Sequence, residues 1–276
     1  MHMPKEAFNF SGKGAANYER YLGPILFEPY ALDLVSKIDD ANVGAVLEIA
    51  CGTGRVTRHL RERFNTDVSL VASDFNADML QVAETRLAGQ PIEFRVEDAQ
   101  QLSFADASFD LVVCQFGWMF LQDKQKGLSE VLRVLKPGGT FIFNTWETTD
   151  NVPLFKVIFN DTILPFFRDE PTARLLVPFS LYDPALLTTW LHETNFIDIK
   201  ASRVILASQS PSPDEIVQGL FVKHSIGKEV LDKDPEAFHQ MAVKMTRAIA
   251  QRFGDAPTRF ELAAFLMSAR KESHFS

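Results

Sequence analysis

Two kinds of apolar pattern alternate along residues 44–146. Short, nearly continuous apolar runs are typical of strands buried on both faces of a parallel sheet, whereas apolar residues that recur every three or four positions indicate one face of a helix. Strands are expected at 45–50, 68–73, 92–96, 111–115 and 140–145, and helices at 54–64, 77–88 and 123–135. This order predicts βαβ units and a parallel sheet, whose ligands bind beyond the carboxyl ends of the strands.

The alternation breaks after Trp146. The segment 151–178 is rich in Phe and Leu, and its prolines are expected to cut it into short pieces. Further on, the sequence predicts a helix at 184–193 capped by Asp183, a strand at 196–207, helices within 213–252 and a last strand at 260–269. The forty residues at 213–252, between the last two strands, exceed an ordinary loop, so we expect a helical cap over a substrate pocket.

The first strand runs into a turn of small residues, and together they read VLEIACGTG from Val46 to Gly54. Glycines at 52 and 54 allow a tight turn and bring backbone N–H groups close to a ligand. The helix that follows places Val56, Leu60 and Phe64 on one face. The loop therefore ends at a helix N-terminus, where a nucleotide-like ligand binds favourably.

Polar residues follow the ends of the neighbouring strands. Asp74 follows the second strand, where an acid can accept hydrogen bonds from the two hydroxyls of a ribose, or can instead cap the next helix. Asp98 follows the third strand, where it serves either an adenine amino group or the turn itself. Gln115, Phe116 and Trp118 follow the fourth, although Trp118 is equally explained by packing against the following helix.

These residues resemble the class I S-adenosylmethionine-dependent methyltransferases. Glu48 followed by Gly52-Thr53-Gly54 is similar to the first motif of that family, and Phe109–Val113 resembles the entry to its fourth strand. The stretch Arg133–Thr140 resembles the signature before strand five. Within it, Lys136-Pro137-Gly138-Gly139 is expected to end the helix and turn the chain, since proline cannot continue a helix.

The resemblance implies an α/β, Rossmann-like, doubly wound and mostly parallel seven-stranded sheet of order 3-2-1-4-5-7-6, with strand 7 antiparallel and a helical cap insertion. Three regions follow from it. They are an N-terminal helical lid at 1–40, a cofactor-binding core at 41–150, and at 151–276 the rest of the sheet (about 184–208 and 259–270) with cap helices (about 151–180 and 212–252).

The cofactor implied is S-adenosyl-L-methionine, with S-adenosyl-L-homocysteine as the product. The resemblance places its binding residues at the strand ends and in the lid, where a tyrosine of the segment 16–21 can reach the methionine carboxylate. We expect Tyr18 to make that contact and Tyr21 to pack on the sheet. The expected cofactor-binding residues are Tyr18, Glu48, Ala50, Cys51, Gly52, Thr53, Gly54, Asp74, Phe75, Met79, Asp98, Ala99, Gln100, Gln115 and Phe116.

One position departs from the family pattern. Ala50 stands where the family most often has its first glycine, and this change bears on affinity rather than on the identity of the cofactor. The competing dinucleotide pattern, G-x-G-x-x-G, fails twice, because Ala50 and Thr57 occupy two of its glycine positions. A nicotinamide cofactor is therefore not expected.

Methyl transfer needs alignment and water exclusion more than a fixed catalytic side chain, so no catalytic residue is assigned. The stretch after strand four lacks the Asn/Asp-Pro-Pro-Tyr/Phe motif of methyltransferases that act on exocyclic or amide nitrogens, and it resembles small-molecule enzymes, including the ubiquinone and menaquinone C-methyltransferases. A base, if one is needed, is His224 or His192. Apolar residues expected to line the acceptor pocket or its lid are Phe155, Phe159, Leu164, Phe166, Phe167, Phe179, Leu220 and Phe221.

The charge and the cysteine content of the chain limit the kinds of molecule that it is expected to bind. A formal net charge of -8 and a pI near 5.3 argue against nucleic acid, and the basic residues of 55–63 are expected to form a solvated helix face. Cys51 and Cys114 have no partner at metal-ligand spacing, so we interpret them as buried hydrophobic residues and expect no metal.

No signal peptide or long apolar span is present, which predicts a cytoplasmic enzyme without membrane insertion, acting on a small-molecule acceptor. The pattern favours neither a monomer nor a homodimer. A protein or RNA methyltransferase and a non-catalytic cofactor-binding domain are the alternatives.

Overall fold

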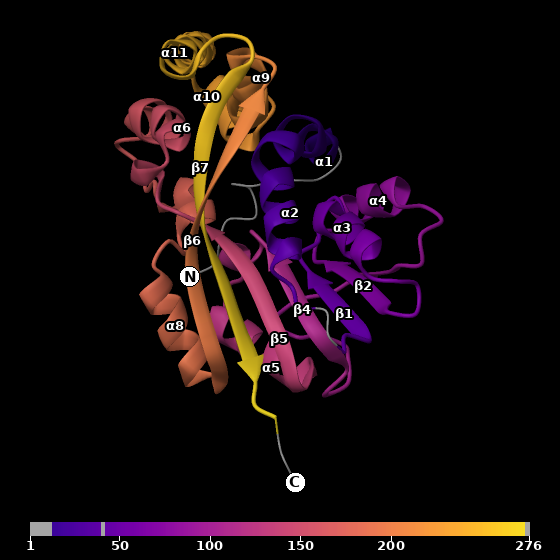
Figure 1. Cartoon of the computed structure of the whole chain (residues 1–276). Helices are drawn as coiled ribbons and strands as arrows, with labels where there is room; N and C mark the ends of the chain where they lie inside the picture. The colour runs from indigo at the N-terminus through magenta and orange to yellow at the C-terminus, as the bar shows by residue number, and fades with distance from the viewer. Residues whose placement is uncertain (1–12, 40–41, 274–276) are drawn as a thin grey trace. The chain divides into compact units, whose positions relative to one another are not determined.

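The computed structural model describes residues 13–39 and 42–273, which divide into two compact units (Figure 1). Of the described residues, the sheet unit contains 30–39, 42–146, 181–204 and 264–273. The helical unit contains 13–29, 147–180 and 205–263.

The sheet has seven strands in the order β3-β2-β1-β4-β5-β7-β6, as expected. Strands β1 to β5 pair in parallel, and β7 pairs with β5 in antiparallel register. Their bounds are β1 Ala45–Ile49, β2 Ser69–Asp74, β3 Glu93–Val96, β4 Phe109–Gln115, β5 Leu135–Trp146, β6 Phe196–Ser210 and β7 Thr258–Lys271. The chain reverses its strand order next to β1 and β4, and ligands of such sheets bind beside this switch point.

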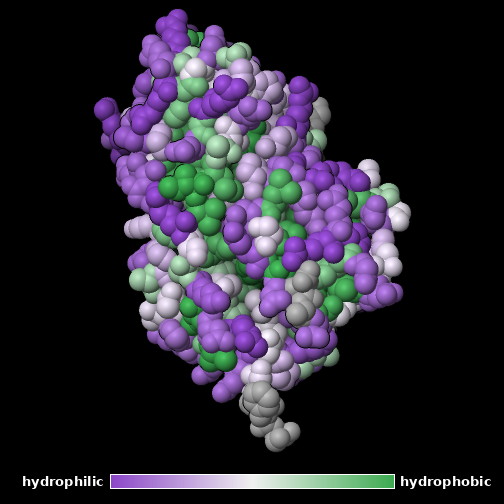
Figure 2. Space-filling model, viewed as in Figure 1, coloured by the Kyte–Doolittle hydropathy of each residue, from purple (hydrophilic) through white to green (hydrophobic). Residues whose placement is uncertain are grey.

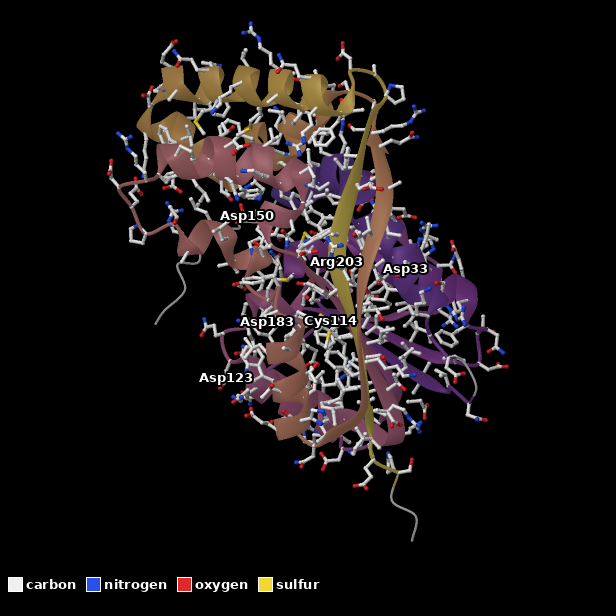
Figure 3. The ribbon with its side chains drawn as sticks, turned by 60° about the vertical axis from the view of Figure 1, so that its left-hand side comes forward. Asp33, Cys114, Asp123, Asp150, Asp183 and Arg203 are labelled. Carbon is white, nitrogen blue, oxygen red and sulfur yellow. The ribbon has the colours of Figure 1, made fainter. Side chains whose placement is uncertain are left out.

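The helices of the sheet unit are α2 Glu28–Ser36, α3 Arg55–Arg63, α4 Ala77–Arg86, η2 Trp118–Phe120, α5 Lys124–Val134 and α8 Pro184–Glu193. The apolar faces of α2 and α3 bury a cluster against the sheet that includes Leu34, Leu60, Val113 and Ile142. Asp123 and Asp183 lie at the beginnings of α5 and α8 (Figure 3), where their carboxylates accept backbone N–H groups of the first turn. The predicted cap Asp183 is therefore confirmed.

The Lys-Pro-Gly-Gly segment behaves differently from the prediction. Helix α5 ends at Val134, and β5 begins at once with Leu135, so residues 136–139 lie within the strand. Gly138 has a φ of 78°, and the register between β4 and β5 shifts between Phe109 and Leu111. The glycines thus accommodate an irregularity in the ladder, which local turn rules alone did not distinguish from a break.

The basic residues of α3 also differ from the prediction of a solvated face. The side chain of Arg61 is 7% exposed, and its guanidinium donates to the backbone carbonyls of Val68, Pro91, Phe64 and Asn65. A guanidinium offers five donors in a fixed fork, which suits several carbonyls at once. Arg61 therefore ties α3 to the loops around β2 and β3.

The helical unit contains both short helices and the 19-residue helix α11, and the helices expected within 213–252 are present. Residues 153–166 form one continuous helix that passes through Pro165, so this proline does not cut the chain as predicted. Within this helix, the π-helical segment Lys156–Ile163 lies before Pro165. The elements are α1 Lys13–Asn17, η1 Tyr18–Phe27, η3 Thr149–Asn151, α6 Pro153–Phe155, η4 Lys156–Ile163, α7 Leu164–Phe166, η5 Ala173–Phe179, α9 Pro213–Val217, η6 Gln218–Val222, α10 Ser225–Lys233 and α11 Pro235–Phe253.

The phenylalanines of the helical unit form its core. Phe155, Phe159 and Phe179 pack on one another with ring centroids 4.9–6.4 Å apart, and Phe221 stacks on Phe238 at 5.2 Å. Of the residues expected to line a pocket, those buried are Phe155, Phe159, Phe167, Phe179, Leu220 and Phe221, whereas Leu164 and Phe166 are half-buried. Core packing accounts for the apolar character of the buried residues, and their role in lining an acceptor pocket or its lid stays a prediction.

Hydrophobic side chains also reach the surface. On the face shown in Figure 2 they form separate groups among hydrophilic residues. Ile197 and Ile205 of the edge strand β6 are 38% and 49% exposed. Exposure alternates along the second half of this strand, as expected where one face of an edge strand is solvated.

Candidate functional site

The loop between β1 and α3 is held in an unusual backbone conformation. Ala50, Gly52 and Gly54 have φ values of 53°, 56° and 77°. Glycine adopts such values without strain, whereas an alanine in the left-handed region costs about 1–2 kcal/mol. Ala50 therefore occupies a strained position, which explains why glycine is the residue most often expected there.

Asp74, at the end of β2, braces this loop. Its Oδ2 accepts the N–H of Gly52 at 2.8 Å, and its Oδ1 accepts the N–H of Asn76 at 2.8 Å. Burial raises the pKa of this carboxyl above its ordinary value, and the two N–H donors oppose that rise. The acid predicted after the second strand thus joins the ends of β1 and β2.

Helix capping is not the role of Asp74. Asn76 is the N-cap of α4, and its side chain accepts the N–H groups of Asp78 and Met79. Asp74 lies two residues earlier, where each carboxylate oxygen holds one backbone N–H and retains a second lone pair. The capping alternative is therefore wrong, and acceptor capacity remains on both oxygens.

Glu48 is buried in β1, with 1% of its surface exposed. The hydroxyl of Thr57 donates to its Oε2 at 2.5 Å. Burial raises the pKa of Glu48 to about 8, with the Thr57 bond lowering it and the charge of Asp74 raising it further. The same burial raises the pKa of the Cys51 and Cys114 thiols, which remain free and protonated at neutral pH.

Asp98 and Gln100 form a turn after β3. Asp98 Oδ1 accepts the backbone N–H of Gln100 at 2.8 Å and its side-chain amide at 3.0 Å. The Oε1 of Gln100 in turn accepts the N–H of Asp123 at 2.7 Å, which links this turn to the start of α5. The turn role considered for Asp98 is therefore present, and Ala99 is buried within it.

Phe116, directly after β4, also has a left-handed backbone, with a φ of 50°. Its ring stacks on Trp146 with centroids 3.8 Å apart, and the ring of Tyr30 meets both edge-on at 5.3 and 5.2 Å. Backbone strain of this kind is concentrated at functional sites. Gln115, immediately before it, is half-buried.

The loops after β1 and β4 touch at Ala50 and Gly117. A Cβ built on Gly117 would lie 2.4 Å from the Cβ of Ala50 and 3.0 Å from the sulfur of Cys114. The methyl group of Ala50 therefore occupies the space that a side chain at 117 would need. Because Ala50 is present, the chain requires glycine at 117.

The other predicted residues of the sheet unit divide by exposure. Phe75 is 75% exposed, whereas Met79 is buried and its Cε lies 3.4 Å from the position of a Gly52 Cβ. Thr53 is buried, and its backbone carbonyl accepts from Arg86 of α4. Trp118 is fully buried against Phe141 and Phe143, so the packing interpretation holds for it.

Tyr18 belongs to the helical unit. It lies half-buried at the start of η1, and its ring stacks on Phe27 at 4.8 Å. Tyr21, in the same helix, packs against Gly219 of η6, where a Cβ would lie 2.7 Å from the Cβ of Tyr21. Tyr21 therefore packs on a helix of its own unit, whereas packing on the sheet was expected. A cofactor contact of Tyr18 stays a prediction.

The two histidines considered as bases differ in setting. Burial lowers the pKa of His224 to about 4, and its Nδ1 accepts the N–H of Ile226 at the start of α10. His192 is exposed near the end of α8. Over residues 13–39 and 42–273, no group of three or more His, Cys, Asp or Glu could hold a metal ion, and no helix is long and apolar enough to cross a bilayer.

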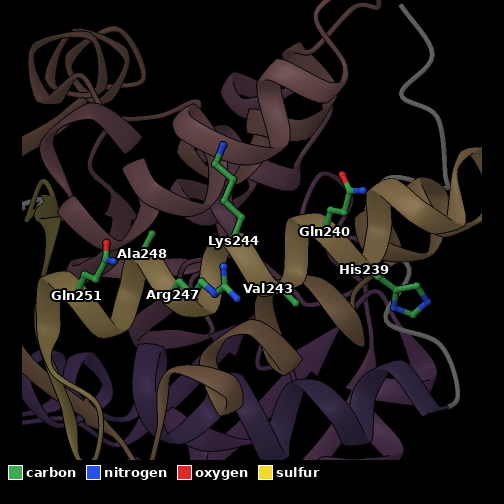
Figure 4. Close-up of a pocket in the computed structure, with 7 residues that line it drawn as sticks. All are labelled: His239, Gln240, Val243, Lys244, Arg247, Ala248 and Gln251. Carbon is green, nitrogen blue, oxygen red and sulfur yellow. The ribbon is translucent and has the colours of Figure 1, made fainter.

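The helical unit has a surface cavity of about 580 Å³ along α11 (Figure 4). Its described lining comes from α11 alone and consists of His239, Gln240, Val243, Lys244, Arg247, Ala248 and Gln251. It contains no carboxylate or hydroxyl. This lining lacks the groups that the loop of the sheet unit offers to a ribose.

Sequence reasoning missed the partners that depend on tertiary contacts. Thr57, Gly117 and Tyr30 hold Glu48, Ala50 and Phe116, respectively. No role was predicted for Asn144 of β5 either, although a polar residue within an apolar run is visible in the sequence. The other contacts leave no such mark in a single sequence.

Comparison with known proteins agrees with this geometry. Residues 47–143 match a family model described as a methyltransferase domain. A ubiquinone/menaquinone biosynthesis C-methyltransferase of Geotalea daltonii is 34% identical over 130 residues, which are 46% of this chain and 55% of that protein. A demethylmenaquinone methyltransferase of Clavibacter sepedonicus is 41% identical over 112 residues, or 40% and 44% of the two chains.

The fold extends further than the sequence similarity. Phosphoethanolamine N-methyltransferase 2 of Haemonchus contortus, solved with phosphomonomethylethanolamine and S-adenosylhomocysteine, superposes with a TM-score of 0.61 at 19% identity, over 96% of this chain and 58% of that one. The chain therefore has the same fold as this enzyme. The chain spans only about half the length of the curated relatives that it matches. The family-model match at residues 47–143 lies within the sheet unit.

Proposed function

We propose that the chain is an S-adenosylmethionine-dependent methyltransferase that acts on a small molecule and releases S-adenosylhomocysteine. The observation that carries the proposal is the bond between Asp74 and the N–H of Gly52. It fixes an acid with spare lone pairs beside a left-handed glycine loop at the switch point of the sheet. The methyltransferase-domain match over residues 47–143 supports it.

The residues present fit this cofactor. Asp74 would accept the vicinal ribose hydroxyls on its free lone pairs, and the buried Met79 would pack beside them. Asp98, Ala99 and Gln100 would flank the adenine. The remaining proposed contacts, to the methionine part and the loop, are Tyr18, Glu48, Ala50, Cys51, Gly52, Thr53, Gly54, Phe75, Gln115 and Phe116.

The proposed methyl transfer depends on how the acceptor is placed relative to the cofactor. When bound, the cofactor supplies a methyl group activated by a positively charged sulfur. The chain's part is to align the acceptor with the methyl and to exclude water, and the stacked Phe116 and Trp146 rings provide an apolar wall for that purpose. With His224 held neutral as a helix cap, no base is assigned.

A small apolar or aromatic acceptor is the favoured substrate class, supported by the relatives with quinone-biosynthesis names and by the aromatic residues at the end of β5. A protein or RNA acceptor is disfavoured by the net charge of -8. A non-catalytic cofactor-binding domain is the remaining alternative. Radiolabelled methyl transfer to a metabolite extract, to total RNA and to protein in parallel distinguishes the three.

Cofactor binding is tested by calorimetry with S-adenosylmethionine and S-adenosylhomocysteine. Asp74→Asn should weaken binding by about 1–3 kcal/mol, because a charged acceptor for two hydroxyls is lost. Asp67→Asn is the matched control, since Asp67 is an exposed acid just before β2. Folded wild-type protein that binds neither compound would remove the proposed function, and equal affinity of the Asp74 variant would remove the ribose role.

A further inference from the structure

Asn144 is a buried amide without a hydrogen-bond partner. Its side chain is 0% exposed, and neither Oδ1 nor Nδ2 has a partner among the described residues. It lies near the carboxyl end of β5, with Gln115 of β4 and Leu266 of β7 as its register partners. The amide therefore lies inside the sheet unit, next to the strand end that carries Phe116.

Folding gives no reason for an amide at this position. Ile142, on the same face of β5, belongs to the apolar cluster under α2 and α3, and so does Leu266 opposite. An amide buried among such residues costs stability unless both of its polar atoms are paired. An apolar side chain would fill this site better, so the amide points to a partner from outside the chain.

The position of Asn144 across the sheet identifies that partner. In the order β2-β1-β4-β5, Asp74 and Asn144 lie three strand spacings apart, about 14 Å. With ribose hydroxyls on Asp74 and the methionine part over β1 and β4, the far side of β4 is where the methyl acceptor must lie. Asn144 is on that side.

We propose that Asn144 is a positioning residue for the methyl acceptor, whose body is apolar and which presents a neutral hydroxyl or carboxamide to the amide. This inference rests on the proposed function and deepens it. An amide offers both donors and an acceptor, so its best complement is a neutral group that also does both. A lone cation or anion would leave half of the amide unpaired.

Aromatic rings surround the route to the amide. Trp146 projects from the same face of β5, one side-chain layer nearer the strand end, and it stacks on the strained Phe116. The amide is closed to solvent here, so entry of an acceptor requires these two rings to part.

The test uses three probes that share the naphthalene ring system and differ in their polar group. Binding of 2-naphthol, 2-naphthamide and naphthalene to the protein saturated with S-adenosylhomocysteine is measured by calorimetry. Wild-type protein should bind the two polar compounds about tenfold or more tighter than naphthalene, and Asn144→Leu should abolish this preference. The same substitution should raise the melting temperature by about 2 °C or more, because an unpaired amide is removed.

Two further variants make the result specific. Thr145→Val removes a neighbouring buried hydroxyl, also unpartnered, whose side chain projects from the opposite face of β5, and it should leave the preference intact. Asn144→Ala covers the case in which leucine does not fit. An unchanged preference in both Asn144 variants, no preference in the wild type, or no binding of any probe overturns the role of Asn144. Failure to bind S-adenosylhomocysteine instead overturns the proposed function.

Discussion

Glu48→Gln should make the protein more stable at alkaline pH. The carboxyl of Glu48 is buried, and its pKa is raised from 4.5 to about 8, chiefly by desolvation. An acid whose pKa is raised on folding contributes full stability below pH 4.5, and this contribution is lost as the pH rises through about 8. The glutamine variant has no such loss, because its side chain never ionises.

The magnitude follows from the two pKa values. Each pKa unit corresponds to about 1.4 kcal/mol, so the ionised carboxylate lowers the free energy of unfolding by about 4–5 kcal/mol once the pH exceeds the folded pKa. Glutamine keeps the shape of glutamate, and its amide oxygen can still accept the Thr57 hydroxyl. Near pH 4.5 the two proteins should therefore have similar stability.

Urea unfolding at a series of pH values from 4.5 to 9 measures this difference. The gap between Glu48→Gln and the wild type should open between pH 5 and 8 and then remain constant. Glu62→Gln on the exposed face of α3 is the matched control and should follow the wild type. If the wild type and the Glu48 variant lose stability in parallel across this range, the carboxyl does not titrate as the burial requires, and the reasoning is wrong.

Two further predictions concern the free energy of unfolding of the sheet unit. Gly117→Ala should lower the free energy of unfolding by about 2 kcal/mol or more, because its Cβ would lie 2.4 Å from that of Ala50. Ala50→Gly in the same chain should restore most of the loss, and additive effects in a double-mutant cycle by thermal unfolding would contradict the contact. Arg61→Met should cost about 2–4 kcal/mol in urea unfolding, since buried carbonyls lose their donors. A loss no greater than that of the exposed Arg63→Met would show that these bonds contribute little.

The sequence predicted those parts of the molecule that local rules determine. The alternating apolar runs predicted the strands, and the family resemblance implied their order. Asp183 could be recognised as a cap because capping involves only neighbouring residues. Arg61 could not be placed, because its carbonyl partners come from loops that the helix pattern does not contain. The phenylalanines after residue 150 could not be assigned to core or pocket from the sequence for a related reason, since core and pocket residues have the same composition.

Ala50 shows how a departure from a family pattern is absorbed. From the sequence, alanine in place of glycine bears on cofactor affinity, because the methyl group lies in the binding loop. In the structure its methyl instead meets Gly117 of the next loop, and the left-handed φ of 53° adds strain in the loop itself. The substitution therefore also bears on stability, and glycine at 117 is the compensation; its effect on cofactor affinity stays a prediction. Two loops that carry candidate site residues are coupled through this contact, so a change in either should be judged with the other.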